Sequence, residues 1–203
     1  MKKLRDYLSL IKFSHTIFAM PFAITGFFIG IFHLKSTRPS LFLVGENIII
    51  SYFSAEYMKF IWVIACMIFA RSAAMAFNRY LDREFDAQNP RTAIREIPKG
   101  IISPSSALRF TILNVILFMG ASFMINMTCF LLSPIALLVI LGYSYTKRFT
   151  ALCHVILGIG LSLAPIGAWL AATGKFAWLP LFFSFAVIFW VSGFDMIYAL
   201  QDE

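Results

Sequence analysis

Three oxygen-bearing side chains recur at four-residue intervals in one stretch of the chain: Asn78, Asp82 and Asp86. On an α-helix this spacing places all three on one face. Mg²⁺ prefers oxygen ligands and usually takes one or two carboxylates together with the phosphates of a substrate. The pattern therefore indicates a magnesium site for a phosphate-bearing substrate. Ion pairs with the arginines that precede each aspartate by three residues, Arg79 and Arg83, are an alternative explanation.

A second acidic pair lies near the end of the chain, in the stretch GFDMIYALQDE. Asp195 and Asp202 are seven residues apart and share a helical face, and Tyr198 lies on nearly the same face. Asp195 interrupts an apolar run that begins near Phe176, where a carboxylate costs roughly 2.5–3.5 kcal/mol on insertion scales. Such residues usually face a bundle interior or a watery cavity, so this pair is predicted to complete the magnesium site. An ion pair between Asp195 and Arg71 is the alternative.

Basic side chains follow both the first acidic cluster and a later short loop. Arg91, Arg95 and Lys99 come after the first cluster, and Lys147 and Arg148 lie in the loop YSYTKRFT. Magnesium and basic side chains together hold phosphates and stabilise a departing one, although basic inner loops are also usual in membrane proteins. No glycine-rich Walker loop is present, which argues against a nucleotide hydrolase. A diphosphate on a lipid tail fits the pattern better.

The elements that must position these groups are membrane helices. Of the 203 residues, 60% are hydrophobic and 13% are charged, a composition that excludes an ordinary soluble domain. Six apolar runs are long enough to cross a hydrocarbon layer of about 30 Å. They are 13–33, 57–81, 105–125, 128–145, 151–172 and 176–200. The predicted fold class is all-α, a polytopic transmembrane helix bundle of about six spanning helices.

Two shorter segments lie outside these spans. The run 41–53 is too short and too polar to cross a membrane and is expected at the interface. The inner loop 82–104 contains Asn89-Pro90, which is predicted to end the helix that carries the first acidic cluster, because a residue before proline disfavours helical geometry. Ser105 and Ser106 are candidate N-caps of the next span.

The distribution of basic residues predicts the orientation in the membrane. With the N-terminus inside, twelve Lys and Arg residues lie on the inner side and four on the outer side. The twelve are Lys2, Lys3, Arg5, Lys12, Arg79, Arg83, Arg91, Arg95, Lys99, Arg109, Lys147 and Arg148. The positive-inside rule then predicts an integral, multi-pass protein with its N-terminus and acidic loops at the cytoplasmic side, in the inner membrane if bacterial. The basic inner loops then face the anionic inner surface of the lipid bilayer, which is the expected partner. This explains the formal net charge of +7 without nucleic acid.

Several of these segments resemble a known family. NRYLDREFDAQNPRT followed by REIPKG resembles the first aspartate-rich motif of the UbiA family of intramembrane prenyltransferases. YSYTKRFT is similar to that family's tyrosine- and lysine-bearing loop, and GFDMIYALQDE to its second aspartate-rich motif. The opening LIKFSHTIFAMPFA resembles the first helix of the 4-hydroxybenzoate polyprenyltransferase branch. The resemblance extends over essentially the whole chain.

The resemblance implies a single transmembrane prenyltransferase domain over residues 1–203, with a central cavity. It implies Mg²⁺-dependent transfer of a polyprenyl group from polyprenyl diphosphate to an aromatic acceptor such as 4-hydroxybenzoate, in ubiquinone or menaquinone biosynthesis. The implied magnesium ligands are Asn78, Asp82, Asp86, Asp195 and Asp202. The four acids are implied to be catalytic together with Lys147. Arg91 would also contact the diphosphate, and Tyr143 and Tyr198 would lie near the allylic carbon.

Two further residues are candidates for substrate binding. Arg71 lies seven residues before Asn78 on the same helical face, about 10 Å deeper at ~1.5 Å per residue. That depth suits the carboxylate of an acceptor held beneath the diphosphate, and a structural ion pair is the alternative. His15 matches the opening of the branch, as a substrate contact or as a histidine buried among helices. His33 and His154 show no partner pattern and receive no role.

The chain departs from the family in two respects. Arg79 stands where most members have aspartate, although one branch commonly shows arginine there. The chain also stops after six of about nine expected spans, so the domain is expected to be C-terminally incomplete, and residues 1–203 alone are expected to transfer no prenyl group. Two other hypotheses remain: a truncated inactive remnant that binds lipid diphosphate, and a membrane carrier that uses Asp195 and Arg71 as a buried charge relay.

Overall fold

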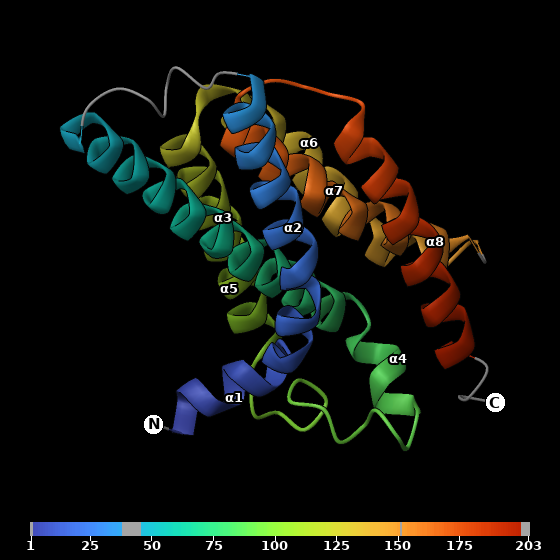
Figure 1. Ribbon diagram of the computed structural model, residues 1–203. Helices are drawn as coiled ribbons and strands as arrows, with labels where there is room; N and C mark the ends of the chain where they lie inside the picture. The colour runs from blue at the N-terminus through green and yellow to red at the C-terminus, as the bar shows by residue number, and fades with distance from the viewer. Residues whose placement is uncertain (1, 38–45, 151, 200–203) are drawn as a thin grey trace.

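The computed structural model describes residues 2–37, 46–150 and 152–199, and within these the side chains of 2–4, 13–15, 18, 46–55, 198 and 199 lie outside the description. The described part is helical and contains no strand, which confirms the all-α prediction (Figure 1). The helices are α1 (Lys2–Leu10), α2 (Phe13–Thr37), α3 (Glu46–Leu81), α4 (Arg83–Gln88), α5 (Pro104–Ile125), α6 (Met127–Thr146), α7 (Cys153–Thr173) and α8 (Leu179–Ala199).

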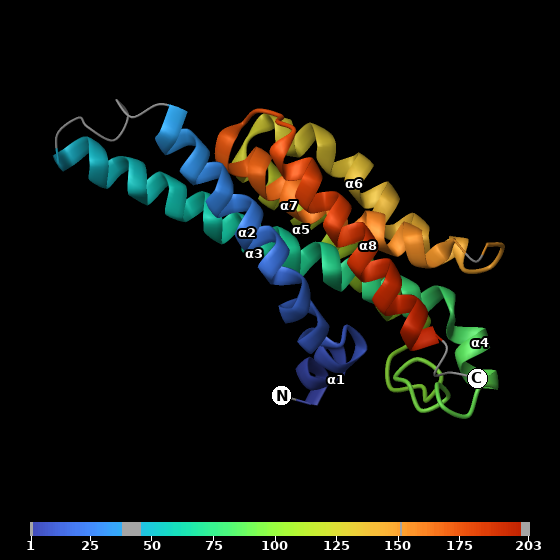
Figure 2. The same cartoon turned by 45° about the vertical axis from the view of Figure 1, so that its right-hand side comes forward.

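Six of the helices in the described ranges are long and apolar enough to cross a membrane. The spans are Ala19–Thr37 in α2, Glu56–Leu81 in α3, the whole of α5, α6 and α7, and Leu179–Ile197 in α8. Each of the six predicted spans has its counterpart, because hydropathy over about 20 residues is a property of the local sequence. The spans alternate in direction, so α1, α4, the loop between α4 and α5, and the last turn of α8 gather at one end of the bundle (Figures 1 and 2).

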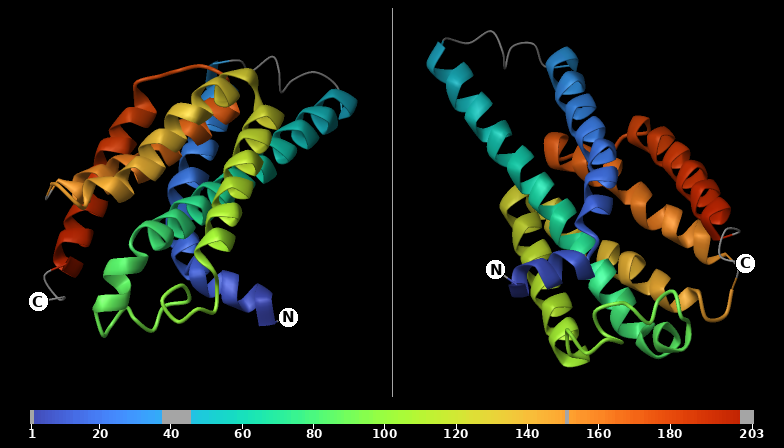
Figure 3. Two further views of the ribbon diagram at one scale, coloured as in Figure 1. Left: turned by 180° about the vertical axis from the view of Figure 1, so that it is seen from behind. Right: turned by 90° about the horizontal axis from the view of Figure 1, so that it is seen from below.

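Close helix packing is achieved with small residues. Ala70, Ala73, Ala74 and Ala76 of α3 are buried. α3 packs most extensively against α5, and α7 packs against both α8 and α2. Within a membrane such packing depends on close approach of the helices rather than on a hydrophobic driving force. In the view from behind, α6 is nearest the viewer and covers most of α7, against which it packs (Figure 3).

At the end that gathers the loops, α1 anchors the segment that follows α4. A buried cluster joins α1, α3, α5 and this segment through Leu10, Ala76, Ile97, Ile102 and Ala107. The Tyr7 ring of α1 lies 4.9 Å from the Phe110 ring of α5. The chain turns from α1 into α2 at Lys12, whose φ of 43° lies in the left-handed region that non-glycine residues rarely adopt. The loop after the first acidic cluster is therefore held against the helices and has a defined position.

The helical path through the first acidic cluster continues across the break between α3 and α4. The backbone N–H of Asp82 donates to the carbonyl of Asn78 (2.9 Å), and the N–H of Asp86 donates to the carbonyl of Asp82 (2.8 Å). Gln88 is the last residue of α4, and Asn89 is extended with φ −95° and ψ 120°. The predicted helix end at Asn89-Pro90 is confirmed.

The predicted N-cap of α5 is wrong. The N-cap of α5 is Ser103, whose Oγ accepts from the backbone N–H of Ser106 (3.2 Å). Pro104, which lacks an N–H, takes the first helical position and leaves the residue before it as the cap. Within the run 41–53, residues 46–53 form the first turns of α3, ahead of the membrane-length span that begins at Glu56, and their place at the interface stays a prediction. Residues 41–45 lie outside the described part.

Candidate active site

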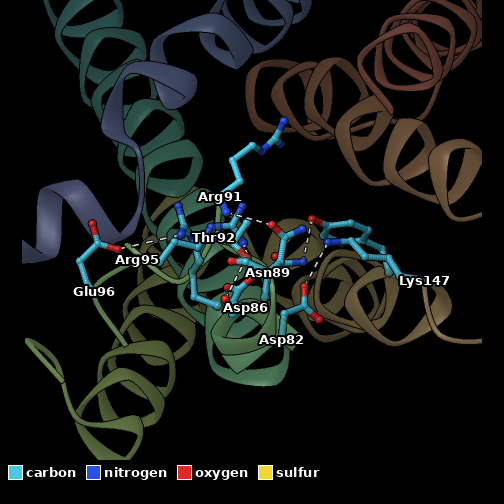
Figure 4. Close-up of polar contacts among 11 residues, drawn as sticks. Asp82, Asp86, Asn89, Arg91, Thr92, Arg95, Glu96 and Lys147 are labelled. Carbon is cyan, nitrogen blue, oxygen red and sulfur yellow. Dashed lines mark hydrogen bonds and ion pairs between the residues drawn. The ribbon is translucent and has the colours of Figure 1, made fainter. Parts of the chain in front are cut away.

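The first acidic motif meets the end of α6 in a compact polar cluster. Asn78 is 8% exposed, and with its amide oxygen toward α6 it accepts from Lys147 Nζ (2.6 Å) and from the Tyr143 hydroxyl (3.1 Å). Its amide nitrogen then donates to Asp82 Oδ2 (3.3 Å), whereas the opposite orientation would set two donors against each other. Lys147 Nζ also lies 3.4 Å from Asp82 Oδ2 (Figure 4). The structure therefore brings together Asn78, Asp82, Tyr143 and Lys147, as predicted. Asp82 and Lys147 are 65 residues apart in the chain.

Asp86, in α4, is 5% exposed and faces the loop that follows. Arg95 NH1 lies 2.6 Å from Asp86 Oδ1, and the Thr92 hydroxyl donates to the Asp86 carbonyl (3.0 Å). The other carboxylate oxygen, Oδ2, is buried and has no hydrogen-bond partner within the described residues. Figure 4 shows Arg95 directed at Asp86, while the Arg91 side chain extends away from both aspartates. Arg95 is thus the basic side chain that pairs with Asp86, and the diphosphate contact expected of Arg91 stays a prediction.

The arginines within the motif do not pair with its aspartates. Arg79, which is 4% exposed, faces Glu96 at 4.0 Å (NH1 to Oε2). Arg83 pairs with Glu84 at 3.0 Å and donates to the carbonyl of Tyr80 (2.9 Å). The alternative explanation by ion pairs at i, i+3 is therefore wrong for this motif. The cations that meet its aspartates come from elsewhere in the chain.

The second acidic motif is described in part. The Asp195 carboxylate Oδ2 lies 2.7 Å from Nδ1 of His154, at the start of α7. Asp195 makes no ion pair with Arg71 in the described part of the chain, so the alternative for Asp195 is wrong there. Asp202 lies outside the described residues, as do the side chains of Tyr198 in α8 and His15 in α2. His154 is a residue that sequence reasoning missed.

The donor set at this end of the bundle fits Mg²⁺ in chemistry. Among the described residues, no three His, Cys, Asp or Glu side chains are close enough to hold a metal by themselves. Mg²⁺ needs no such cage, because substrate phosphates and water supply most of its ligands. Asp82 and the Asn78 amide are adjacent, and Oδ2 of Asp86 is a buried oxygen without a hydrogen-bond partner among the described residues. These are hard oxygen ligands of the kind that Mg²⁺ takes.

Cations concentrate where the loop after α4 meets the turn between α1 and α2. Burial, followed by the charges of Arg79, Arg95 and Arg91, lowers the pKa of Lys12, and Glu96 opposes the shift. Four basic side chains therefore contribute to one positive region at this end of the molecule.

An apolar cavity of about 170 Å³ lies in the centre of the bundle, between α2, α3, α5, α6 and α7. Its lining is mainly alanine, leucine, isoleucine and valine, and Arg71 is the one charged residue among the described residues that line it. The Arg71 Nε is buried without a hydrogen-bond acceptor in the described part. Tyr143 lines the same cavity and also bonds to Asn78, so the polar cluster and the cavity share a side chain.

Comparison with known proteins shows which family the chain belongs to. Residues 39–203 match the UbiA prenyltransferase family. The chain belongs to this family. It is 38% identical over 136 residues to a 4-hydroxybenzoate octaprenyltransferase from Nitrosomonas eutropha, a match that covers 66% of this chain and 47% of that protein. The chain thus spans about half the length of this curated relative.

Solved structures of UbiA homologues share the fold. The apo structure of a UbiA homologue from Aeropyrum pernix superposes with a TM-score of 0.74 at 29% identity, covering 93% of this chain and 64% of that one. A UbiA homologue from Archaeoglobus fulgidus bound to GPP and Mg²⁺ gives a TM-score of 0.69 at 21% identity, covering 97% and 63%. The second likeness shows the fold alone. UbiA membership and six membrane-length helices identify an integral membrane protein.

Proposed function

We propose that the protein transfers a polyprenyl group from a polyprenyl diphosphate to an aromatic acceptor such as 4-hydroxybenzoate, with Mg²⁺, in ubiquinone or menaquinone biosynthesis. Residues 1–203 belong to one transmembrane prenyltransferase domain in this proposal. The observation that carries it is the position of Tyr143, which bonds to Asn78 in the polar cluster and also lines the apolar cavity. A substrate with a charged head and an apolar tail matches that junction.

Lys147 and Arg95 provide the charge that holds the diphosphate. Each already lies beside a motif carboxylate, at 3.4 Å from Asp82 and 2.6 Å from Asp86, so each can turn from that acid to a phosphate oxygen. Both donate charge-assisted hydrogen bonds to the oxygens on which charge develops. Asn78, Asp82, Asp86, Asp195 and Asp202 would hold Mg²⁺. When bound, Mg²⁺ would neutralise the diphosphate and favour its departure.

Transfer then needs one bond to break and one to form. The C–O bond between the allylic carbon and the diphosphate breaks with both electrons on oxygen. A ring carbon of the acceptor bonds to the allylic carbon, and the proton on that ring carbon passes to the released diphosphate. The Tyr143 ring, at the boundary of cluster and cavity, lies where the electron-poor allylic carbon would pass. The apolar cavity wall keeps water from that carbon.

Arg71 is the proposed contact for the acceptor carboxylate. It is the charged residue of the described cavity lining, and its Nε is a buried donor that has no acceptor among the residues the structure describes. A buried unpaired polar group is costly, and a carboxylate ligand would remove that cost. The proposed orientation has the N-terminus and the acidic loops in the cytoplasm. It follows the positive-inside distribution and agrees with the collection of α1, α4 and the loop at one end (Figure 1).

The test is formation of prenylated 4-hydroxybenzoate from a polyprenyl diphosphate. It is run with residues 1–203 and with the whole reading frame that encodes them, in detergent or lipid, with Mg²⁺ or with chelator. Asp82→Asn should abolish product, because the amide keeps the size and loses the charge. Glu84→Gln is the matched control, since Glu84 is 76% exposed and bonds only locally within the described structure. Product that persists with chelator, or equal loss in both variants, would refute the magnesium assignment.

The rival functions give different results in the same preparation. A lipid-diphosphate-binding remnant would bind polyprenyl diphosphate with Mg²⁺ and make no product from either chain length. A carrier would respond to membrane potential or pH, and its activity would be insensitive to chelator. The carrier relay is weakened by the pairing of Asp195 with His154 and not with Arg71 in the described residues.

A further inference from the structure

His154 and Asp195 form a contact that the proposed chemistry does not yet use. His154 lies in the first turn of α7 and Asp195 near the end of α8, 41 residues later, with Nδ1 and Oδ2 at 2.7 Å. In the described part of the chain this is the single hydrogen bond to the Asp195 side chain. An ionised aspartate only accepts, so the proton in this contact belongs to His154 Nδ1. Oδ2 is thereby held, and Oδ1 is left for another ligand.

The packing of α7 on α8 fixes the distance between these two residues. One turn beyond His154, Gly158 lies so close to α8 that a Cβ there would be 2.8 Å from the Ile188 carbonyl oxygen and 2.5 Å from Ser192 Oγ. One turn further, the Ser184 hydroxyl donates to the Ser162 carbonyl (2.8 Å). These contacts recur along the same faces of the two helices, so neither helix can shift without losing them. The His154–Asp195 bond is therefore built into a rigid pair of helices.

We propose that His154 is a positioning residue that holds the Asp195 carboxylate with Oδ1 free to bind the magnesium–diphosphate complex. This rests on the proposed function, in which Asp195 is a metal ligand. A carboxylate near a helix end samples several rotamers, and ordering it at the moment of binding costs free energy. A hydrogen bond that is already present removes part of that cost. Losing such a supporting partner typically weakens metal affinity about 10- to 100-fold.

Three substitutions separate positioning from other roles of His154. Asn places its amide nitrogen near the position of Nδ1 and keeps the bond to Asp195. Gln places its amide near the position of Nε2 and does not keep that bond. Leu fills the space without a donor. If His154 instead bound the metal or substrate directly through Nε2, Gln would be the better replacement.

The assay measures the binding of Mn²⁺, a paramagnetic substitute for Mg²⁺, to the purified protein in the presence of inorganic pyrophosphate. Electron paramagnetic resonance detects the bound Mn²⁺. Melting of the metal-free protein is measured beside it. We expect His154→Leu and His154→Gln to raise the Mn²⁺ concentration at half-saturation about tenfold or more, with His154→Asn within about threefold of wild type. The melting temperatures of the three variants are expected to differ little from one another.

Two results would overturn the proposal. Wild-type Mn²⁺ binding in His154→Leu would show that His154 is only a helix contact. Weak binding in His154→Asn equal to that in His154→Leu would show that the Nδ1 bond is not what matters. Asp195→Asn distinguishes failure of the metal-ligand assignment from failure of the positioning role. If this variant binds Mn²⁺ as wild type does, Asp195 is not a ligand, and the proposed metal site fails together with the role of His154. If Asp195→Asn weakens binding and His154→Leu does not, the positioning role alone fails.

Discussion

Gly158→Ala tests the α7–α8 packing that supports Asp195. The added Cβ would lie 2.8 Å from the Ile188 carbonyl oxygen, 3.3 Å from Ile188 Cα and 2.5 Å from Ser192 Oγ. The Ser192 side chain can avoid the added Cβ by changing rotamer, but the Ile188 backbone can move away only if α8 moves. To restore an ordinary contact of about 3.5 Å, the two helices must separate by about 0.7 Å. Overpacking of this kind costs about 1–3 kcal/mol.

That separation acts on the His154–Asp195 contact one turn away. A bond of 2.7 Å would lengthen toward the limit of a hydrogen bond if the helices moved apart as rigid bodies. Alanine has a higher helix propensity than glycine by about 1 kcal/mol, which offsets part of the overpacking. The expected net effect is destabilisation of up to about 2 kcal/mol, with weaker Mn²⁺ binding.

Gly160→Ala is the control, two residues further along α7. A Cβ at Gly160 meets nothing within 4 Å, so only the gain in helix propensity applies. Thermal unfolding of the two purified variants in the same detergent is the assay. Gly158→Ala should melt several degrees below wild type, and Gly160→Ala at or above it. A Gly158→Ala protein that melts with or above Gly160→Ala would refute the inferred close approach.

Three further predictions concern other parts of the molecule. Ser103→Ala should lose about 1 kcal/mol of stability as the cap of α5 is removed, and Ser105→Ala should lose almost none, both by thermal unfolding. Arg71→Gln should raise the Michaelis constant for 4-hydroxybenzoate and leave that for the prenyl donor unchanged in steady-state assays. Because the pKa of Lys12 is lowered from 10.5, its charged form destabilises the fold, so wild type should gain stability as the pH rises through that lowered pKa, whereas Lys12→Met should not. Melting curves across alkaline pH measure this difference.

The spans, the shared face of the first acidic motif and the helix end before Pro90 could all be predicted from the sequence. Each depends on neighbours within about a helical turn or on hydropathy over one span. The N-cap of α5 was also within reach, because Pro104 has no N–H to place inside the helix. Ser105 and Ser106 were chosen by residue type, whereas the position of the proline decides the cap.

The partners of the acids could not be predicted in this way. Lys147 meets Asp82 and His154 meets Asp195 across 65 and 41 residues, so each pair depends on the relative rotation and depth of two packed helices. Arg95 meets Asp86 because the chain reverses after Asn89, and its side chain then returns toward α4. A sequence read one segment at a time shows which residue types are present, but it does not show these crossings.

Arg79, the departure from the common family motif, is explained by the same reversal. Glu96 faces Arg79 at 4.0 Å, and Ser9 of α1 donates to the other Glu96 oxygen at 2.5 Å. An aspartate at position 79 would remove this attraction and would add a second negative charge on the side of α3 that faces Glu96. Because Arg95 and Glu96 are adjacent, the loop pairs with the helices twice, once at Asp86 and once at Arg79. A basic residue at position 79 thus faces the loop that brings Arg95 to the acidic motif, and among the described residues it forms no ion pair with Asp82 or Asp86.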